Sequence, residues 1–350
     1  MTIKTSAGNF FEDFSLGQVI EHATPRTLTS GDVALYTALY GSRFAVQSSE
    51  SFARAIGYEA APLDDLLVFH TVFGKTVADI SLNAVANLGY AECRFLAPVF
   101  PGDTLRAIST VIGLRENSSG KTGIVYVRSR GMNQKEETVL EYVRWVMVRK
   151  RDAGAATSNE APDLAAKVDP TEIGTAVPEI DGEAYNSALA GSRARWDDYE
   201  AGERIDHQDG MTIEEAEHQM ATRLYQNTAR VHFNQHLEGQ RTFGKRLVYG
   251  GHVISLARAL SFNGLANAFH ISAINAGRHI APVFAGDTLY AWSEVLEKAE
   301  LSGRDDVGAL RLRTVGVKNR TPEGFPYMAD ENTPEEGVVL DLDYWAIMPR

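Results

Sequence analysis

An internal duplication constrains the fold of this chain more than any other feature. The segment RFLAPVFPGDTL at residues 94–105 returns as RHIAPVFAGDTL at residues 278–289, 184 positions later. Residues 11–22 (FEDFSLGQVIEH) likewise return at residues 196–207 (WDDYEAGERIDH), 185 positions later. Solenoid units recur every ~20–50 residues, so a repeat of this length indicates a duplicated domain.

The segment between the two copies has the composition of a linker. Its first part, RDAGAATSNEAPDLAAKVDP, is rich in Ala, Pro, Gly, Asp and Ser and has no sustained apolar period. We therefore predict an N-terminal domain at residues 1–150, a linker with short helical pieces at residues 151–191, and a C-terminal domain at residues 192–350. A linker of this length lets the second copy fold back onto the first.

Both copies show the same order of secondary-structure patterns. A first helix is followed by a polar loop, a longer apolar helix and three strands. A capping-box pattern, Thr212 with Glu215, marks the start of one helix. A long central helix wrapped by an antiparallel sheet in each half predicts an α+β protein with a tandem, or double, hot-dog fold. The predicted helices are residues 30–40, 66–80, 212–225 and 252–265, and the predicted strands are 104–114, 123–130, 139–150, 289–298, 309–318 and 338–348.

The composition argues against several classes of partner. The 350 residues carry a formal net charge of −12, whereas nucleic acids and anionic membranes are bound by basic surfaces. No apolar run approaches the ~20 residues of a membrane helix, and the first residues lack a signal-peptide pattern. The single cysteine, Cys93, excludes an internal disulfide and is expected to be buried on a strand. We expect a cytoplasmic protein without membrane or nucleic-acid partners.

Two segments of the second copy carry the residues that point to chemistry. Residues 225–234 read YQNTARVHFN, and residues 247–252 read LVYGGH at the start of the longer helix. Together with the repeated Pro-Val-x-x-Gly-Asp-Thr-Leu segments, they resemble the MaoC-like, or hydratase 2, family of enoyl-CoA hydratases. The loop is most similar to that of the mesaconyl-CoA hydratase (β-methylmalyl-CoA dehydratase) subfamily. The resemblance covers nearly the whole chain apart from the linker, and it implies a double hot dog that hydrates or dehydrates an acyl-CoA.

The resemblance also implies two catalytic residues in this loop. His232 falls on the catalytic histidine of the family, and Asn227 stands where most members have a catalytic aspartate. An asparagine cannot act as a base, so we expect His232 to carry the proton and Asn227 to orient the water or hydroxyl group. In the first copy, Gln47 and Ser42 align with His232 and Asn227. That copy lacks a general base and is predicted to be a scaffold or acyl-binding half.

The glycine pair at the start of the longer helix suits a thioester carbonyl. Charge develops on this oxygen during hydration, and the first turn of a helix offers unpaired N–H groups at the positive end of the dipole. Gly250 and Gly251 have no side chain, so a carbonyl oxygen can approach their backbone closely. We expect the Gly251 amide to be the oxyanion donor.

A mesaconyl substrate also has a free carboxylate, for which a guanidinium is a suitable partner. Arg43 and Arg230 lie in the equivalent loops of the two copies and are our candidates for this role. Lys245 and Arg246 are candidates for contacts with the phosphates of CoA.

Two other functions fit parts of the sequence. Asp64 and Asp65 open the longer helix of the first copy, where hot-dog thioesterases often have a carboxylate, although acids in a first turn also complement the helix dipole. A non-catalytic acyl-CoA-binding protein is the second alternative, because the usual aspartate is missing. The histidine spacing closes no metal site, and no dinucleotide glycine pattern occurs. We expect no metal, no cofactor besides the CoA of the substrate, and assembly into a homodimer or higher homo-oligomer.

Overall fold

One antiparallel sheet runs through the whole molecule. The computed structural model describes residues 4–155 and 159–350, and in these residues the sheet has 11 strands in the order β1-β3-β4-β5-β2-β8-β11-β10-β9-β6, with β7 paired to β9. The strands of the first half are β1 (Val19–Thr27), β2 (Ala84–Phe95), β3 (Thr104–Glu116), β4 (Thr122–Met132) and β5 (Thr138–Arg149). Those of the second half are β6 (Arg204–Asp206), β7 (Met211–Thr212), β8 (His270–His279), β9 (Thr288–Glu300), β10 (Val307–Lys318) and β11 (Val338–Pro349).

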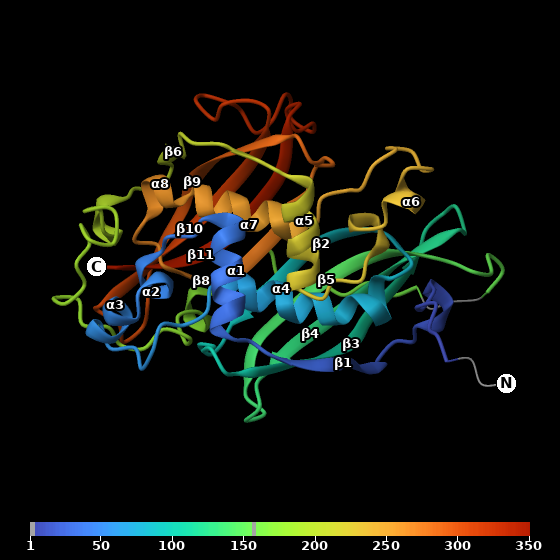
Figure 1. The fold of residues 1–350 in the computed structure, drawn as a ribbon, viewed down its shortest axis with the longest axis horizontal. Helices are drawn as coiled ribbons and strands as arrows, with labels where there is room; N and C mark the ends of the chain where they lie inside the picture. Colours follow the sequence, from blue (N-terminus) through green and yellow to red (C-terminus); the bar gives the residue numbers. More distant parts are fainter. Residues whose placement is uncertain (1–3, 156–158) are drawn as a thin grey trace.

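Each half has one central helix, α4 in the first and α7 in the second. Both lie in front of the sheet, with α1 and α5 running across them (Figure 1). All ten residues from Gly251 to Leu260 of α7 are buried, which is the pattern of a helix enclosed on every side. The helices are α1 (Ser30–Tyr40), α2 (Ala45–Ser48), α3 (Glu50–Ala55), α4 (Asp65–Thr76), α5 (Glu215–Leu224), α6 (Gln235–Glu238), α7 (Gly250–Leu260) and α8 (Phe262–Leu265), with a π-helical turn at Val77–Ser81 and 3-10 turns at Phe11–Asp13, Pro170–Glu172, Trp196–Asp198 and Arg230–His232. The helix-in-sheet arrangement predicted for both halves is confirmed.

The predicted start of the first helix in the second half is wrong. Helix α5 begins at Glu215 with Glu214 as its N-cap, and Thr212 makes no capping box. Thr212 lies instead in strand β7, where it pairs with Thr288 and their hydroxyl oxygens are 2.8 Å apart. The sheet edge supplies partners for this backbone, and pairing with β9 prevails over the local helix-start pattern.

The two halves join through strands β2 and β8. Tyr90 pairs with Gly277, and Cys93 pairs with Ile274. The 184-residue repeat makes Ile274 the counterpart of Tyr90 and Gly277 the counterpart of Cys93, so the joint is self-complementary, as at a twofold dimer interface. Cys93 is fully buried there, as predicted. The chain thus builds within itself the pairing of two similar subunits.

The segment between the two copies contacts both halves of the sheet: Glu160 forms a bridge with Leu114 of β3, and from Val168 on the segment packs on the second half. Val168 donates its N–H to Asn275 Oδ1 at 2.8 Å, and its carbonyl accepts the indole N–H of Trp345 at 3.1 Å. Ile180 and Tyr185 are buried in the same cluster as Trp345. Residues 168–185 are therefore held by specific contacts, and they include a 3-10 turn at Pro170–Glu172. Within the part of the chain that the structure describes, no helix combines the length and the apolar character needed to cross a membrane.

Candidate active site

The loop that follows α5 lies against helix α4 of the other half. Tyr225 ends α5, and Gln226 adopts a left-handed conformation with φ 52°. The N–H of Asn227 then bonds to the Thr222 carbonyl at 3.0 Å. Gly74 of α4 permits this contact, because a Cβ at that position would lie 1.8 Å from the carbonyl oxygen of Tyr225. A glycine of the first half therefore determines where the loop of the second half sits.

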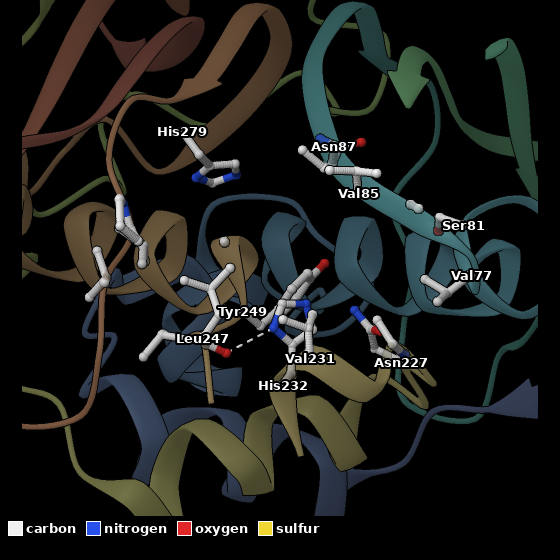
Figure 2. Close-up of a pocket in the computed structure, with 18 of the residues that line it drawn as sticks. Val77, Ser81, Val85, Asn87, Asn227, Val231, His232, Leu247, Tyr249 and His279 are labelled. Carbon is white, nitrogen blue, oxygen red and sulfur yellow. Dashed lines mark hydrogen bonds between the residues drawn. The ribbon is translucent and has the colours of Figure 1, made fainter. Parts of the chain in front are cut away.

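Asn227 is buried in this loop with its amide orientation fixed. Its Oδ1 accepts the backbone N–H of Ala229 at 2.9 Å. The opposite amide orientation would set Nδ2 against a donor, so the hydrogen bond assigns the two ends of the side chain. The Nδ2 group remains free to donate, and it points to the side of His232 (Figure 2). Asn227 can therefore hold an oxygen but cannot take its proton.

His232 is fixed in the tautomer of a base. It lies in the 3-10 turn Arg230–His232, and its Nδ1 is 2.9 Å from the carbonyl oxygen of Leu247 (Figure 2). A carbonyl only accepts, so Nδ1 carries the hydrogen and Nε2 has the free lone pair. The ring packs against Tyr249 at 5.4 Å between centroids. Burial lowers the pKa of His232 to about 4, so the imidazole is neutral at pH 7.

The first turn of α7 presents free backbone donors beside this histidine. Tyr249 is the N-cap, and its side chain makes no capping hydrogen bond. Gly250 lines the pocket and packs under His279, since a Cβ on Gly250 would lie 2.3 Å from His279 Nε2. Gly251 is buried and is not among the lining residues; a Cβ there would meet the ring of His70 at 2.6 Å. Gly250 therefore borders the cavity, whereas Gly251, whose amide we expected to be the oxyanion donor, does not.

These residues surround one cavity of about 350 Å³ between the two halves. Val77, Tyr90 and Arg144 come from the first half, and they face Asn227, His232 and Gly250 from the second. Figure 2 shows Val77, Ser81, Val85 and Asn87 along one wall and the loop with Asn227 and His232 along another. A volume of this size suits a small acyl group. The cavity needs both copies of the repeat.

Three polar residues of the cavity were missed by the sequence reasoning. The guanidinium Nε of Arg144, the Nε2 of His279 and both amide atoms of Asn87 are buried without a hydrogen-bond partner among the described residues. Arg144 follows Leu140 and Tyr142 on the inward face of β5, a charge at a core position. His279 stands where the first copy has Phe95, so the alignment of the two copies contained this signal.

The equivalent place in the first half is closed. The side chain of Asp64 caps α4 by accepting the N–H of Leu66 at 2.9 Å, and Asp65 pairs with His270 at 2.8 Å. Gln47 donates its amide to the Phe269 carbonyl at 2.8 Å. The cavity that remains beside Asp65 holds about 10 Å³, room for at most one water molecule. The two aspartates are thus engaged in structural contacts.

The four cationic candidates are dispersed. Arg230 is exposed and lines the cavity. Arg43 does not line it, because its guanidinium lies over the ring of Phe262 at 4.5 Å. Lys245 lies over the ring of Phe284 at 4.5 Å, and Arg246 forms an ion pair with Glu215. Arg43 and Arg230 therefore do not converge on one carboxylate. No cluster of three or more metal-ligating side chains occurs in residues 4–155 and 159–350.

Solved structures with this arrangement identify the class of protein. A MaoC domain protein dehydratase of Chloroflexus aurantiacus superimposes with a TM-score of 0.97 at 64% identity, covering 100% of this chain and 99% of that chain. A Mycobacterium tuberculosis protein described as a double hot dog has a TM-score of 0.74 at 26% identity, covering 98% and 99%. The fold is that of a MaoC-like double hot-dog protein, as predicted from the duplication and the loop.

Sequence relatives narrow this class to one family. A family model described as mesaconyl-CoA hydratase matches residues 2–324. The β-methylmalyl-CoA dehydratase of Chloroflexus aurantiacus is 64% identical over 351 residues, covering 100% of this chain and 99% of the relative. The mesaconyl-CoA hydratase of Cereibacter sphaeroides is 60% identical over 350 residues, covering 99% and 100%. The chain belongs to the mesaconyl-CoA hydratase family.

Proposed function

We propose that this protein is a hydro-lyase that reversibly hydrates mesaconyl-CoA to β-methylmalyl-CoA. The observation that carries the proposal is the neutral His232, which shares one cavity with the donor of Asn227 and the free helix-start amide of Gly250. A base, an oxygen holder and an oxyanion donor are the groups that hydration of an enoyl thioester requires. The two relatives that are 64% and 60% identical are named for the same substrate pair, which supports the proposal.

In the hydration direction, His232 is the proton carrier. Its Nε2 accepts a proton from a water molecule held by Asn227 Nδ2, and the water oxygen bonds to the β-carbon. The electron pair of the double bond moves toward the α-carbon and the thioester carbonyl, whose oxygen is stabilised by the Gly250 N–H. The imidazolium then returns the proton to the α-carbon, which restores the thioester and the neutral histidine. Dehydration reverses each step.

One carrier for both transfers has a stereochemical consequence. Hydroxyl and hydrogen are delivered from the side of the substrate that faces His232, so the addition is syn. The reaction is redox-neutral, and His232 moves its protons, so we propose that the enzyme needs no resident metal or cofactor. Hydration in ²H₂O, followed by analysis of the product by NMR, tests the syn geometry.

The thioesterase alternative has little support from the first half. Both of its helix-start carboxylates are occupied, Asp64 by a backbone N–H and Asp65 by His270. A carboxylate already held in this way has no cavity beside it for a thioester. The hydratase hypothesis is favoured because His232 lines the open cavity.

The decisive experiment follows enoyl-thioester absorbance and free thiol together. We expect rapid absorbance loss from mesaconyl-CoA with no thiol release. His232→Gln, which introduces the residue that the first copy has at Gln47, should remain folded and lose about 10²- to 10⁴-fold in kcat/KM. Thiol release at the rate of absorbance loss would establish a thioesterase, and tight binding without turnover would establish a binding protein.

We also propose a cytoplasmic enzyme that assembles into homo-oligomers. The fully buried single cysteine, Cys93, fits a reducing compartment. Size-exclusion chromatography with light scattering tests the assembly, and a mass of one chain at micromolar concentration would rule it out.

A further inference from the structure

Arg144 is a buried cation in the wall of the active-site cavity. It lies on β5, is fully buried, and lines the cavity with Phe73 and Tyr90. One Nη donates to Thr76 Oγ1 at 2.8 Å, and Ser81 Oγ is 3.4 Å from both Nη atoms. The guanidinium stacks over Phe73, with its central carbon 4.3 Å from the ring centroid.

No acidic side chain in residues 4–155 and 159–350 forms an ion pair with this guanidinium. The guanidinium donates its hydrogen bonds to the hydroxyls of Thr76 and Ser81 and stacks on Phe73, and none of the ion pairs among the described residues includes it. Its Nε is buried without a partner. An uncompensated charge in such a place is costly, and buried charges in proteins are normally paired. Burial also lowers the pKa of Arg144. The site is electrostatically incomplete until an anion enters.

The arginine is a departure from the internal repeat. Tyr90 pairs with Arg144 in the first half, and its counterpart Ile274 pairs with Tyr344 in the second. Tyr344 therefore occupies the position equivalent to Arg144, and its hydroxyl contacts Thr314 Oγ1 at 3.1 Å. The fold does not require a cation here. The charge is present only in the first half, at a position that borders the open cavity.

The other arginines of the cavity are placed differently. Arg149 and Arg230 are exposed, and Arg241 is an exposed residue paired with Glu238 at 2.8 Å. Water screens charges in such positions. Among these four arginines, only Arg144 has a buried guanidinium with an unpaired Nε–H. The Nε–H and the neighbouring Nη–H form the edge of a guanidinium that binds a carboxylate with two parallel hydrogen bonds.

We propose that Arg144 forms the subsite for the free carboxylate of the acyl group, and that it selects dicarboxylic monothioesters over simple acyl-CoAs. This inference rests on the proposed function, because it assigns one end of that substrate. In mesaconyl-CoA the carboxylate is bonded to the β-carbon that receives the hydroxyl group. Arg144 then fixes this carbon relative to His232 and offsets the negative charge that would repel an incoming hydroxide-like oxygen.

The test compares two substrates that differ at this group. (E)-2-Methylbut-2-enoyl-CoA has a methyl group where mesaconyl-CoA has the carboxylate. For wild type we expect kcat/KM to favour mesaconyl-CoA by at least about 10³-fold. In Arg144→Met this preference should fall by about 10²- to 10³-fold, mainly through the loss of activity on mesaconyl-CoA. Arg230→Met is the matched control and should change both substrates by the same factor.

Each alternative result has a separate meaning. An unchanged preference in folded Arg144→Met, or a collapse of the preference in Arg230→Met, would overturn the subsite. Equal hydration of both substrates by wild type would overturn it while leaving the hydratase in place. If Arg144→Met does not fold, Arg144→Lys keeps the charge without the planar edge and should lose mesaconyl-CoA activity selectively. If wild type hydrates neither substrate, calorimetry with succinyl-CoA and butyryl-CoA still tests the subsite, and equal affinities would refute it.

Discussion

At the scale of single residues, the protonation state of His232 sets the working pH range. Burial lowers its pKa to about 4, and the base must be neutral to accept a proton from water. The group is neutral above its pKa, so kcat/KM for mesaconyl-CoA should stay level from pH 8 to about 5 and be halved near pH 4. Initial rates across this range, taken over times in which the enzyme stays folded, check the prediction. An acid limb near pH 6.5 would contradict an enclosed histidine.

The amide of Asn227 can be tested by a minimal change, because aspartate replaces only its nitrogen by an oxygen. Asn227→Asp keeps the acceptor for the Ala229 N–H but removes the Nδ2 donor and adds a negative charge to the cavity. We expect kcat to fall about 10-fold, for one lost hydrogen bond. The new charge should raise the pKa of His232, so the acid limb should move to higher pH. A variant with an unshifted limb would show that the two side chains do not interact.

At the scale of elements, the close approach of α4 to the loop with Asn227 and His232 depends on a glycine in α4. A Cβ on Gly74 would lie 1.8 Å from the Tyr225 carbonyl oxygen, so the loop would have to move. Because misplacement by about 1 Å can cost 10²-fold in rate, Gly74→Ala should lower kcat by about that factor while the protein stays folded. Gly182→Ala is the control, since nothing lies within 4 Å of its Cβ position. Equal rates in both variants would refute the role of the contact.

The same contact shows what the sequence could and could not predict. Helix α1 was predicted with its observed bounds, and α4 and α7 within two residues at their starts, because apolar periodicity is local to each helix. His232 and Asn227 were predicted from the resemblance of one short loop, and both line the cavity. Gly74 and Arg144 were missed because they act across the joint between the halves, and no spacing along the chain encodes that contact. Thr212 was misassigned because its partner, Thr288, is distant in sequence.

At the scale of the whole molecule, a self-complementary joint supports one open site and one closed site. Strands β2 and β8 pair with twofold-related register, so each half could offer a cavity against the central helix of the other. The closed site has the Asp65–His270 pair, whereas the open site has Gly250 beside an unpartnered His279. The first site has Gln47 and Ser42 in place of His232 and Asn227, and its polar side chains make structural contacts. The two equivalent places of the duplicated fold therefore differ: one is filled by structural contacts, and the other is an open cavity.

The buried histidines of this joint and its surroundings make the fold sensitive to acid. Burial lowers the pKa of His70 and His252 to about 3, and of His207, His232 and His279 to about 4. The unfolded chain binds these protons near pH 6.5, so between pH 6.5 and 4 the unfolded state holds more protons than the folded state. The free energy of unfolding must therefore decrease as the pH is lowered through this range. Each histidine contributes a slope of up to about 1.4 kcal/mol per pH unit. The urea midpoint should therefore drop markedly from pH 7 to 5.

His252→Leu, which introduces the residue of the first copy at Leu67, should reduce this pH dependence by about one proton. Equal midpoints at pH 7 and 5 would mean that these histidines are accessible to protons in the folded protein.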